Sequence, residues 1–130
     1  MITFETFTTE EGIPIYLQII RHIKRGIVSG AIVHGEEVPS RRVLSALLGV
    51  NPNTIQKAYA VLEEEGLMES RSGAKSCMCL SEEKITAVRQ QLLESDALSV
   101  VSALKQMGLS KPEALGLIER YWEQKDEEKD

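Results

Sequence analysis

Residues 38–66 read VPSRRVLSALLGVNPNTIQKAYAVLEEEG, and the prediction of the fold starts from their helix caps and apolar spacing. Ser40 is a residue type that caps helix N-termini, and Gly49 ends the apolar pattern after it, which predicts a short helix between them. Asn51 is a second N-cap, and Pro52 suits the first position of another helix. Two short helices separated by two residues are typical of a helix-turn-helix.

The two predicted helices have different faces. In the first we expect a buried side made of Val43, Leu44, Leu47 and Leu48. In the second, a spacing of 100° per residue gathers an apolar side, namely Ile55, Ala58, Tyr59 and Leu62. Its opposite side carries Asn53, Gln56 and Lys57, and acids appear only at the far end, from residue 63 onward. An acid-free polar face at a helix start favours contact with an anion.

The segments on either side complete a winged helix. An apolar spacing from Ile15 to Ile27 predicts a helix over about 14–29, after an extended lead-in of 11 residues without a period. Residues 33–37 are expected to form a loop. After Gly66, residues 67–70 and 76–80 resemble two short strands around a loop that contains Gly73, which predicts a hairpin.

The remainder, residues 81–130, is predicted to be helical. One long amphipathic helix extends to Met107, with a kink or break near Ser95-Asp96 because its apolar seam drifts there. Ser110 and Glu113 have the spacing of a capping box and begin a last helix. Two such helices make a poor core alone, so we expect a second copy to cover their apolar stripe, namely Leu92, Leu93, Val100, Leu104, Ile118 and Trp122.

The predicted fold is therefore mainly α with a small β-wing. Residues 1–80 form a winged helix-turn-helix for DNA binding, and residues 81–130 form a two-helix dimerisation region. The composition, with 42% hydrophobic and 27% charged residues in a chain of 130, is that of a folded soluble protein. No apolar run is long enough for a membrane span and no signal peptide is visible, so we expect a cytoplasmic protein.

The net charge of −5 conceals an uneven distribution. Residues 12–80 hold eight basic and six acidic residues, whereas residues 81–130 hold seven basic and eleven acidic ones. The first part can thus attract DNA while the second keeps the protein soluble. A second hypothesis is a winged-helix module whose acidic half binds another protein.

No catalytic, cofactor-binding or metal-binding constellation is present in the sequence. Cys77 and Cys79 are too few and too close for a disulfide scaffold, and two soft ligands without a nearby His make a poor metal site. We expect small buried hydrophobic residues there. A third hypothesis is a thiol- or metal-responsive sensor that uses both cysteines.

Four ordered segments resemble the GntR family of bacterial transcription regulators: IPIYLQI (13–19), VPSRR (38–42), LGVNPNTIQKAY (48–59) and LEEEGL (62–67). The short helical C-terminal part, including KQMGLSKPE (105–113), resembles the YtrA-type subgroup. The resemblance implies a homodimer that binds double-stranded DNA, predicted here as a repressor on an inverted-repeat operator. About 50 residues follow the winged helix, too few for a roomy effector pocket within one protomer, although an effector could sit between protomers.

The resemblance also assigns the DNA contacts. In the family these come from the start of the second helix, the start of the recognition helix and the wing, which here are Ser40, Arg41, Arg42, Asn51, Asn53, Thr54, Gln56, Lys57, Gly73 and Lys75. The residue types fit, because amides and hydroxyls pair with base edges and cations pair with phosphates. Many members have Ser-Arg at Asn51-Pro52 and Arg at Gln56, so the operator sequence cannot be read by analogy.

Overall fold

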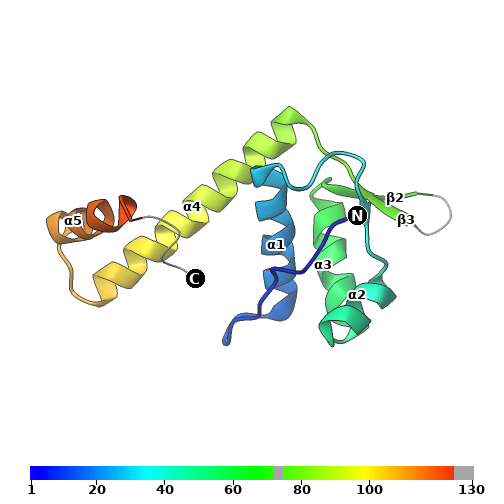
Figure 1. The fold of residues 1–130 in the computed structure, drawn as a ribbon, viewed down its shortest axis with the longest axis horizontal. Coiled ribbons are helices and arrows are strands. Elements are labelled where there is room, and N and C mark those ends of the chain that lie inside the picture. The colour runs from blue at the N-terminus through cyan, green and yellow to red at the C-terminus, as the bar shows by residue number, and fades with distance from the viewer. Residues whose placement is uncertain (72–74, 125–130) are drawn as a thin grey trace. The chain divides into compact units, whose positions relative to one another are not determined.

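The structure of the protein is a computed structural model that describes residues 1–71 and 75–124. These residues form helices and short strands (Figure 1). In chain order they are α1 (Ile15–Ser29), β1 (Glu37–Val38), α2 (Arg41–Leu48), α3 (Pro52–Glu64), β2 (Met68–Arg71), β3 (Lys75–Met78), α4 (Glu82–Gln106) and α5 (Lys111–Trp122). This mainly helical architecture with one small antiparallel sheet confirms the predicted fold class.

Side-chain caps hold the starts of α2 and α3. The Ser40 hydroxyl accepts a hydrogen bond from the Val43 amide at 3.1 Å, and the Asn51 side chain accepts one from the Asn53 amide at 2.8 Å. Gly49 ends α2 with a φ of 68°, a left-handed conformation that glycine adopts without strain. The predicted caps are thus confirmed, and they define the turn between the two helices.

The predicted buried side of α2 is only partly correct. Leu44 is buried, but Val43 and Leu47 are 57% and 67% exposed, so their assignment to the buried side was wrong. The reason is geometric. The face that packs inward is an i, i+3, i+4, i+7 stripe made of Arg41, Leu44, Ser45 and Leu48. Val43 and Leu47 are apolar, but each lies one residue, about 100°, away from that stripe.

The sheet has three antiparallel strands in the order β1-β3-β2. β2 and β3 form the predicted hairpin, in which Glu69 pairs with Cys77 and Arg71 pairs with Lys75. On its other side, β3 pairs with β1 through Glu37 and Cys77. The sequence predicted a loop up to residue 37, and a strand of two residues is too short to show a period of two.

The core lies between α1, α3 and the sheet. Its fully buried side chains include Ile19, Ile23, Leu44, Ile55, Tyr59, Leu62 and Met78. The N-terminal lead-in also contributes, because Ile2 and Phe4 are buried and the Ile2 amide donates to the Glu37 carbonyl at 3.2 Å. The Phe4 ring stacks on His22 of α1 with centroids 4.6 Å apart. A segment without any period is therefore fastened to both α1 and β1.

The chain divides into two compact units, Met1–Leu92 and the part that begins at Leu93. The first turns of α4 belong to the first unit, since Val88 is buried in its core. Lys24 of α1 is also buried, and its ammonium group donates to Glu65 at 2.8 Å and to Gln91 at 2.7 Å. These contacts extend the first unit beyond residue 80, where the sequence predicted a boundary.

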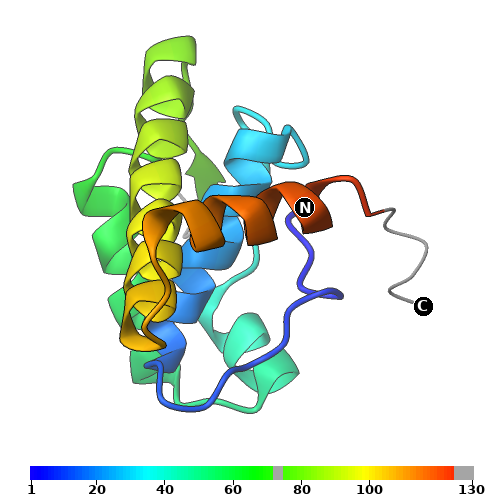
Figure 2. The ribbon, with the colours of Figure 1, turned by 90° about the vertical axis from the view of Figure 1, so that its left-hand side faces the viewer.

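α4 continues from Glu82 to Gln106 as one helix (Figure 2), so of the predicted kink or break near Ser95-Asp96 the break was wrong. Neither residue is a proline or a glycine, and a drifting apolar seam alone does not interrupt backbone hydrogen bonds. Before α5, the predicted capping box is confirmed, because Ser110 and Glu113 each cap the other's backbone amide. Among the described residues, no helix combines the length and apolar character needed to span a membrane.

Candidate nucleic-acid interface

The polar face of α3 is exposed as predicted. Asn53, Gln56 and Lys57 are exposed, whereas the opposite side of the helix is fully buried in the core. Thr54 is half-buried between the two sides. Amide side chains on an exposed helix can pair with adenine in a major groove, and a lysine can reach guanine or a phosphate. The first two turns of α3 therefore present hydrogen-bonding groups without any acid among them.

The caps leave hydrogen-bond donors beside this face. Ser40 and Asn51 use their side-chain oxygens to accept backbone bonds, which leaves the Ser40 hydroxyl proton and the Asn51 amide group free to donate. Both residues are exposed. Donors at helix N-termini are suited to phosphate oxygens.

Lys57 does not point freely into solvent. Its ammonium nitrogen lies 4.1 Å from the centroid of the Tyr16 ring, at the start of α1. An ammonium over a phenol ring is held by the negative face of the ring. Tyr16 thus joins the candidate interface as a residue that the sequence reasoning missed. The aromatic side chain near the start of α1 was the available signal.

The two adjacent arginines of α2 have different surroundings. Arg42 is exposed and forms no ion pair within the part of the chain that the structure describes. Arg41 instead donates to Glu63 of α3 at 3.0 Å, and its guanidinium lies 5.3 Å from the centroid of the Tyr59 ring. The structure therefore places Arg42 with the exposed donors and holds Arg41 against α3.

The wing is described at its base only. Gly73 lies outside the described residues. Lys75 begins β3, is 73% exposed and pairs with Glu37 at 3.5 Å. Opposite it in register, Arg71 pairs with Glu69 at 3.4 Å and was missed by the sequence reasoning, although its place beside the wing loop was a signal. Exposed ion pairs of this kind contribute only about 0–1 kcal/mol, so a phosphate can replace the carboxylate partner.

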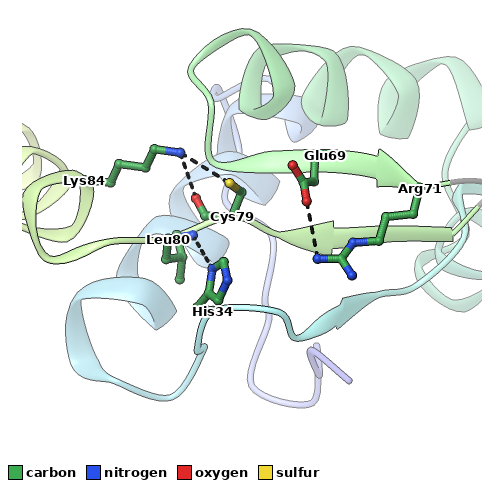
Figure 3. A network of polar contacts seen from close by, with 6 residues as sticks. All are labelled: His34, Glu69, Arg71, Cys79, Leu80 and Lys84. Carbon is green, nitrogen blue, oxygen red and sulfur yellow. Dashed lines mark hydrogen bonds and ion pairs between the residues drawn. The ribbon is translucent and has the colours of Figure 1, made fainter.

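Cys77 lies in β3 and Cys79 directly follows it, and Figure 3 shows the surroundings of Cys79. Cys77 and Cys79 are free thiols, and both are half-buried. Lys84 donates to the Gly66 carbonyl at 2.6 Å and lies 3.4 Å from the Cys79 sulfur. His34 accepts from the Leu80 amide at 3.0 Å. In residues 1–71 and 75–124, no three metal-binding side chains converge.

Comparison with known proteins agrees with this arrangement. A family model described as "Bacterial regulatory proteins, gntR family" matches residues 15–75. The uncharacterised HTH-type transcriptional regulator YhcF of Bacillus subtilis (strain 168) is 33% identical over 110 residues, which cover 85% of this chain and 91% of YhcF. The HTH-type transcriptional repressor YtrA of the same organism is 38% identical over 85 residues, covering 61% of this chain and 65% of YtrA.

Solved structures give the same result. A GntR family transcriptional regulator from Listeria monocytogenes superposes with a TM-score of 0.74 at 28% identity, covering 86% of this chain and 98% of that one. YtrA from Sulfolobus acidocaldarius, a GntR-family transcription factor, matches with a TM-score of 0.52 at 31% identity over 68% of this chain and 92% of that one.

The fold and the exposed face of α3 define a winged-helix transcription regulator with a DNA-binding domain, a class without enzymatic activity. The chain belongs to the GntR family and is a short regulator of the YtrA type.

Proposed function

We propose that the protein is a homodimeric repressor that binds an inverted-repeat operator through α3. The observation that carries the proposal is the acid-free exposed face made of Asn53, Gln56 and Lys57. In a helix-turn-helix, the second helix lies in the major groove with its N-terminal residues at the base edges. Gln56 and Asn53 then read bases, and Lys57 contacts guanine or phosphate.

The start of α2 and the wing hold the protein on the DNA backbone. Ser40, Arg42 and Asn51 donate to phosphates around the reading face, and Thr54 donates at the edge of α3. Gly73 and Lys75 supply the wing contact, in which glycine permits close approach and lysine adds charge. Such contacts fix orientation and carry no base preference of their own.

Dimerisation is assigned to the second unit. Leu93, Val100, Ile118 and Trp122 are between 40% and 80% exposed there, which is unusual for large apolar side chains on a monomer. Leu104 is half-buried in the same unit. Leu92, in contrast, packs against the core of the first unit and contributes less to the stripe than expected. A second copy covers the stripe with the two-fold symmetry that an inverted repeat requires.

The sign of regulation rests on similarity. The relative YtrA of Bacillus subtilis is named a transcriptional repressor. The aligned residues cover 61% of this chain and 65% of YtrA. Transcription in vitro of a gene whose promoter carries the selected operator, with and without the protein, tests the sign of regulation. Repression requires less transcript when the protein is present.

Selection of bound fragments from the host genome supplies the operator and tests the reading face. Gln56→Ala should relax the preference at one base pair per half-site, at a cost of about 1–3 kcal/mol there. Arg42→Ala should weaken binding to all sequences alike. Arg89→Ala removes the same charge from α4 and is the matched control. An unchanged base preference in Gln56→Ala contradicts the reading role.

A further inference from the structure

Arg41 lies on the inward face of α2. It belongs to the same helical stripe as Leu44, which is fully buried, and Ser45, which is 8% exposed. Arg42, one residue further along, is turned by about 100° and is exposed. The two arginine side chains therefore leave α2 in directions about 100° apart. Only Arg42 shares the outward side with the proposed phosphate donors.

Among the described residues, the ion pair and the ring contact of Arg41 are both made with α3. One guanidinium nitrogen donates to Glu63 at 3.0 Å, and the group lies over the ring of Tyr59. Tyr59 and Glu63 are four residues apart, so they lie on the same side of α3. The Arg41 Nε atom is buried and has no hydrogen-bond partner in the described part of the chain, so this nitrogen does not face a phosphate from this position, although 34% of the side chain is exposed.

Tyr59 ties the same two elements together a second time. Its hydroxyl, in a fully buried side chain, donates to the Pro39 carbonyl at 2.7 Å. Pro39 precedes the N-cap of α2, and Arg41 follows it. One residue of α3 thus contacts the chain on both sides of Ser40, which fixes the start of α2 relative to α3.

From these contacts we infer that Arg41 is a positioning residue for DNA binding and makes no contact with DNA. It holds the start of α2, with Ser40 and Arg42, at a set distance from the reading face of α3. This inference rests on the proposed function, because it presumes that both elements contact one duplex. The Arg41 and Glu63 side chains are each 34% exposed, less than either partner of the two wing pairs, and the guanidinium also lies over Tyr59. Because this pair stays formed in the positioning role, Arg41 releases no counterions from DNA.

Full-length variants and the selected operator test this role. Arg41→Met keeps the aliphatic stem but removes the ion pair, and Glu63→Ala removes the partner. Each variant should bind the operator about tenfold more weakly than the wild type. The double variant should have an affinity no lower than that of the poorer-binding single variant, because the two residues act as one unit. The slope of log K against log salt should stay at the wild-type value.

Glu64→Ala is the matched control, since it removes the same charge from an exposed position one residue away. A direct contact predicts another pattern. Arg41→Met would then flatten the salt slope by about 2 in a dimer, and Glu63→Ala would bind no more weakly than Glu64→Ala. Either result overturns the inference.

Arg41→Lys provides a milder change that keeps the charge if Arg41→Met does not fold, as judged by circular dichroism. A positioning role requires it to weaken binding at an unchanged salt slope, whereas wild-type affinity overturns the inference. If the wild-type protein itself selects no DNA, the proposed function fails, and that failure is distinguishable from the patterns above.

Discussion

Lys24 places a charged group in the core, with only 5% of the residue exposed, whereas its partner Glu65 keeps 37% of its side chain exposed. Glu65→Ala leaves a buried ammonium that, among the described residues, keeps its hydrogen bond to Gln91 but has no carboxylate, and it should lower the free energy of unfolding by about 2–3 kcal/mol. Lys24→Met fills the same space and leaves a carboxylate that water can reach, so its loss should stay below about 1 kcal/mol. Urea denaturation of both variants measures the difference, and a larger loss for Lys24→Met would contradict this account.

Burial raises the pKa of the Tyr59 hydroxyl, and the nearby Arg41 opposes this only in part. An unfolded tyrosine loses its proton at about pH 10, so the stability that Tyr59 contributes is complete below that pH and is lost as the pH rises above it. Tyr59→Phe should lower the free energy of unfolding by about 1–2 kcal/mol at pH 7, because the Pro39 carbonyl loses its donor. The decline between about pH 9 and 11 should be shallower in Tyr59→Phe. The free energy of unfolding is measured by urea denaturation at each pH. If it declined equally steeply with pH in both proteins, the phenol could not be buried as described.

For single residues, the sequence identified which side chains are chemically suited to DNA contact better than it predicted which way each side chain points. Arg41 and Arg42 are identical neighbours at the start of the second helix, so the family resemblance assigned both to DNA. Their difference follows from which stripe of α2 packs inward, and the apolar Val43 and Leu47 suggested the wrong stripe. Five of the eight residues of α2 are apolar and they lie on more than one side of the helix, so hydrophobicity alone does not select the buried face.

Elements with local signals were predicted closely. α3 begins after Asn51 at Pro52, and α5 begins at the Ser110 capping box, because a cap needs only neighbouring residues. β1 was missed since its two residues are ordered by pairing with β3, which is remote in sequence. The hairpin was predicted because its own turn encodes it.

Ser110→Ala tests the cap of α5. The change removes the acceptor of the Glu113 amide and should destabilise the helix by about 1 kcal/mol. The backbone amide and the hydroxyl of Ser110 hold the pKa of Glu113 below its ordinary value. The stabilisation that comes from the ionised Glu113 carboxylate is therefore present above about pH 4.3, the pKa of an unfolded glutamate. It is lost as the pH falls through the lower pKa of the folded state. Helicity measured by circular dichroism at pH 7 should fall relative to Ser99→Ala, a control within α4, and equal helicity would exclude a role for the cap.

For the whole molecule, the division at Leu92 determines where the chain can be cut. A fragment of residues 1–92 keeps Lys84, Val88 and Gln91, which bond to or pack on the first unit. It should fold and sediment as a monomer, because the proposed dimer stripe is removed. Cutting after Leu80 removes these contacts and should give a less stable fragment. A dimer of residues 1–92 would move the interface into the winged helix.

In the proposed function, a dimer binds DNA through Arg42 and the faces of α3 and the wing. The most direct measurement is the affinity of the full chain for its selected operator as a function of salt. Two copies of Arg42, Lys57, Arg71 and Lys75 neutralise about six to eight phosphates, which predicts a slope of about −5 to −7 for log K against log salt. A slope near zero would contradict the claim.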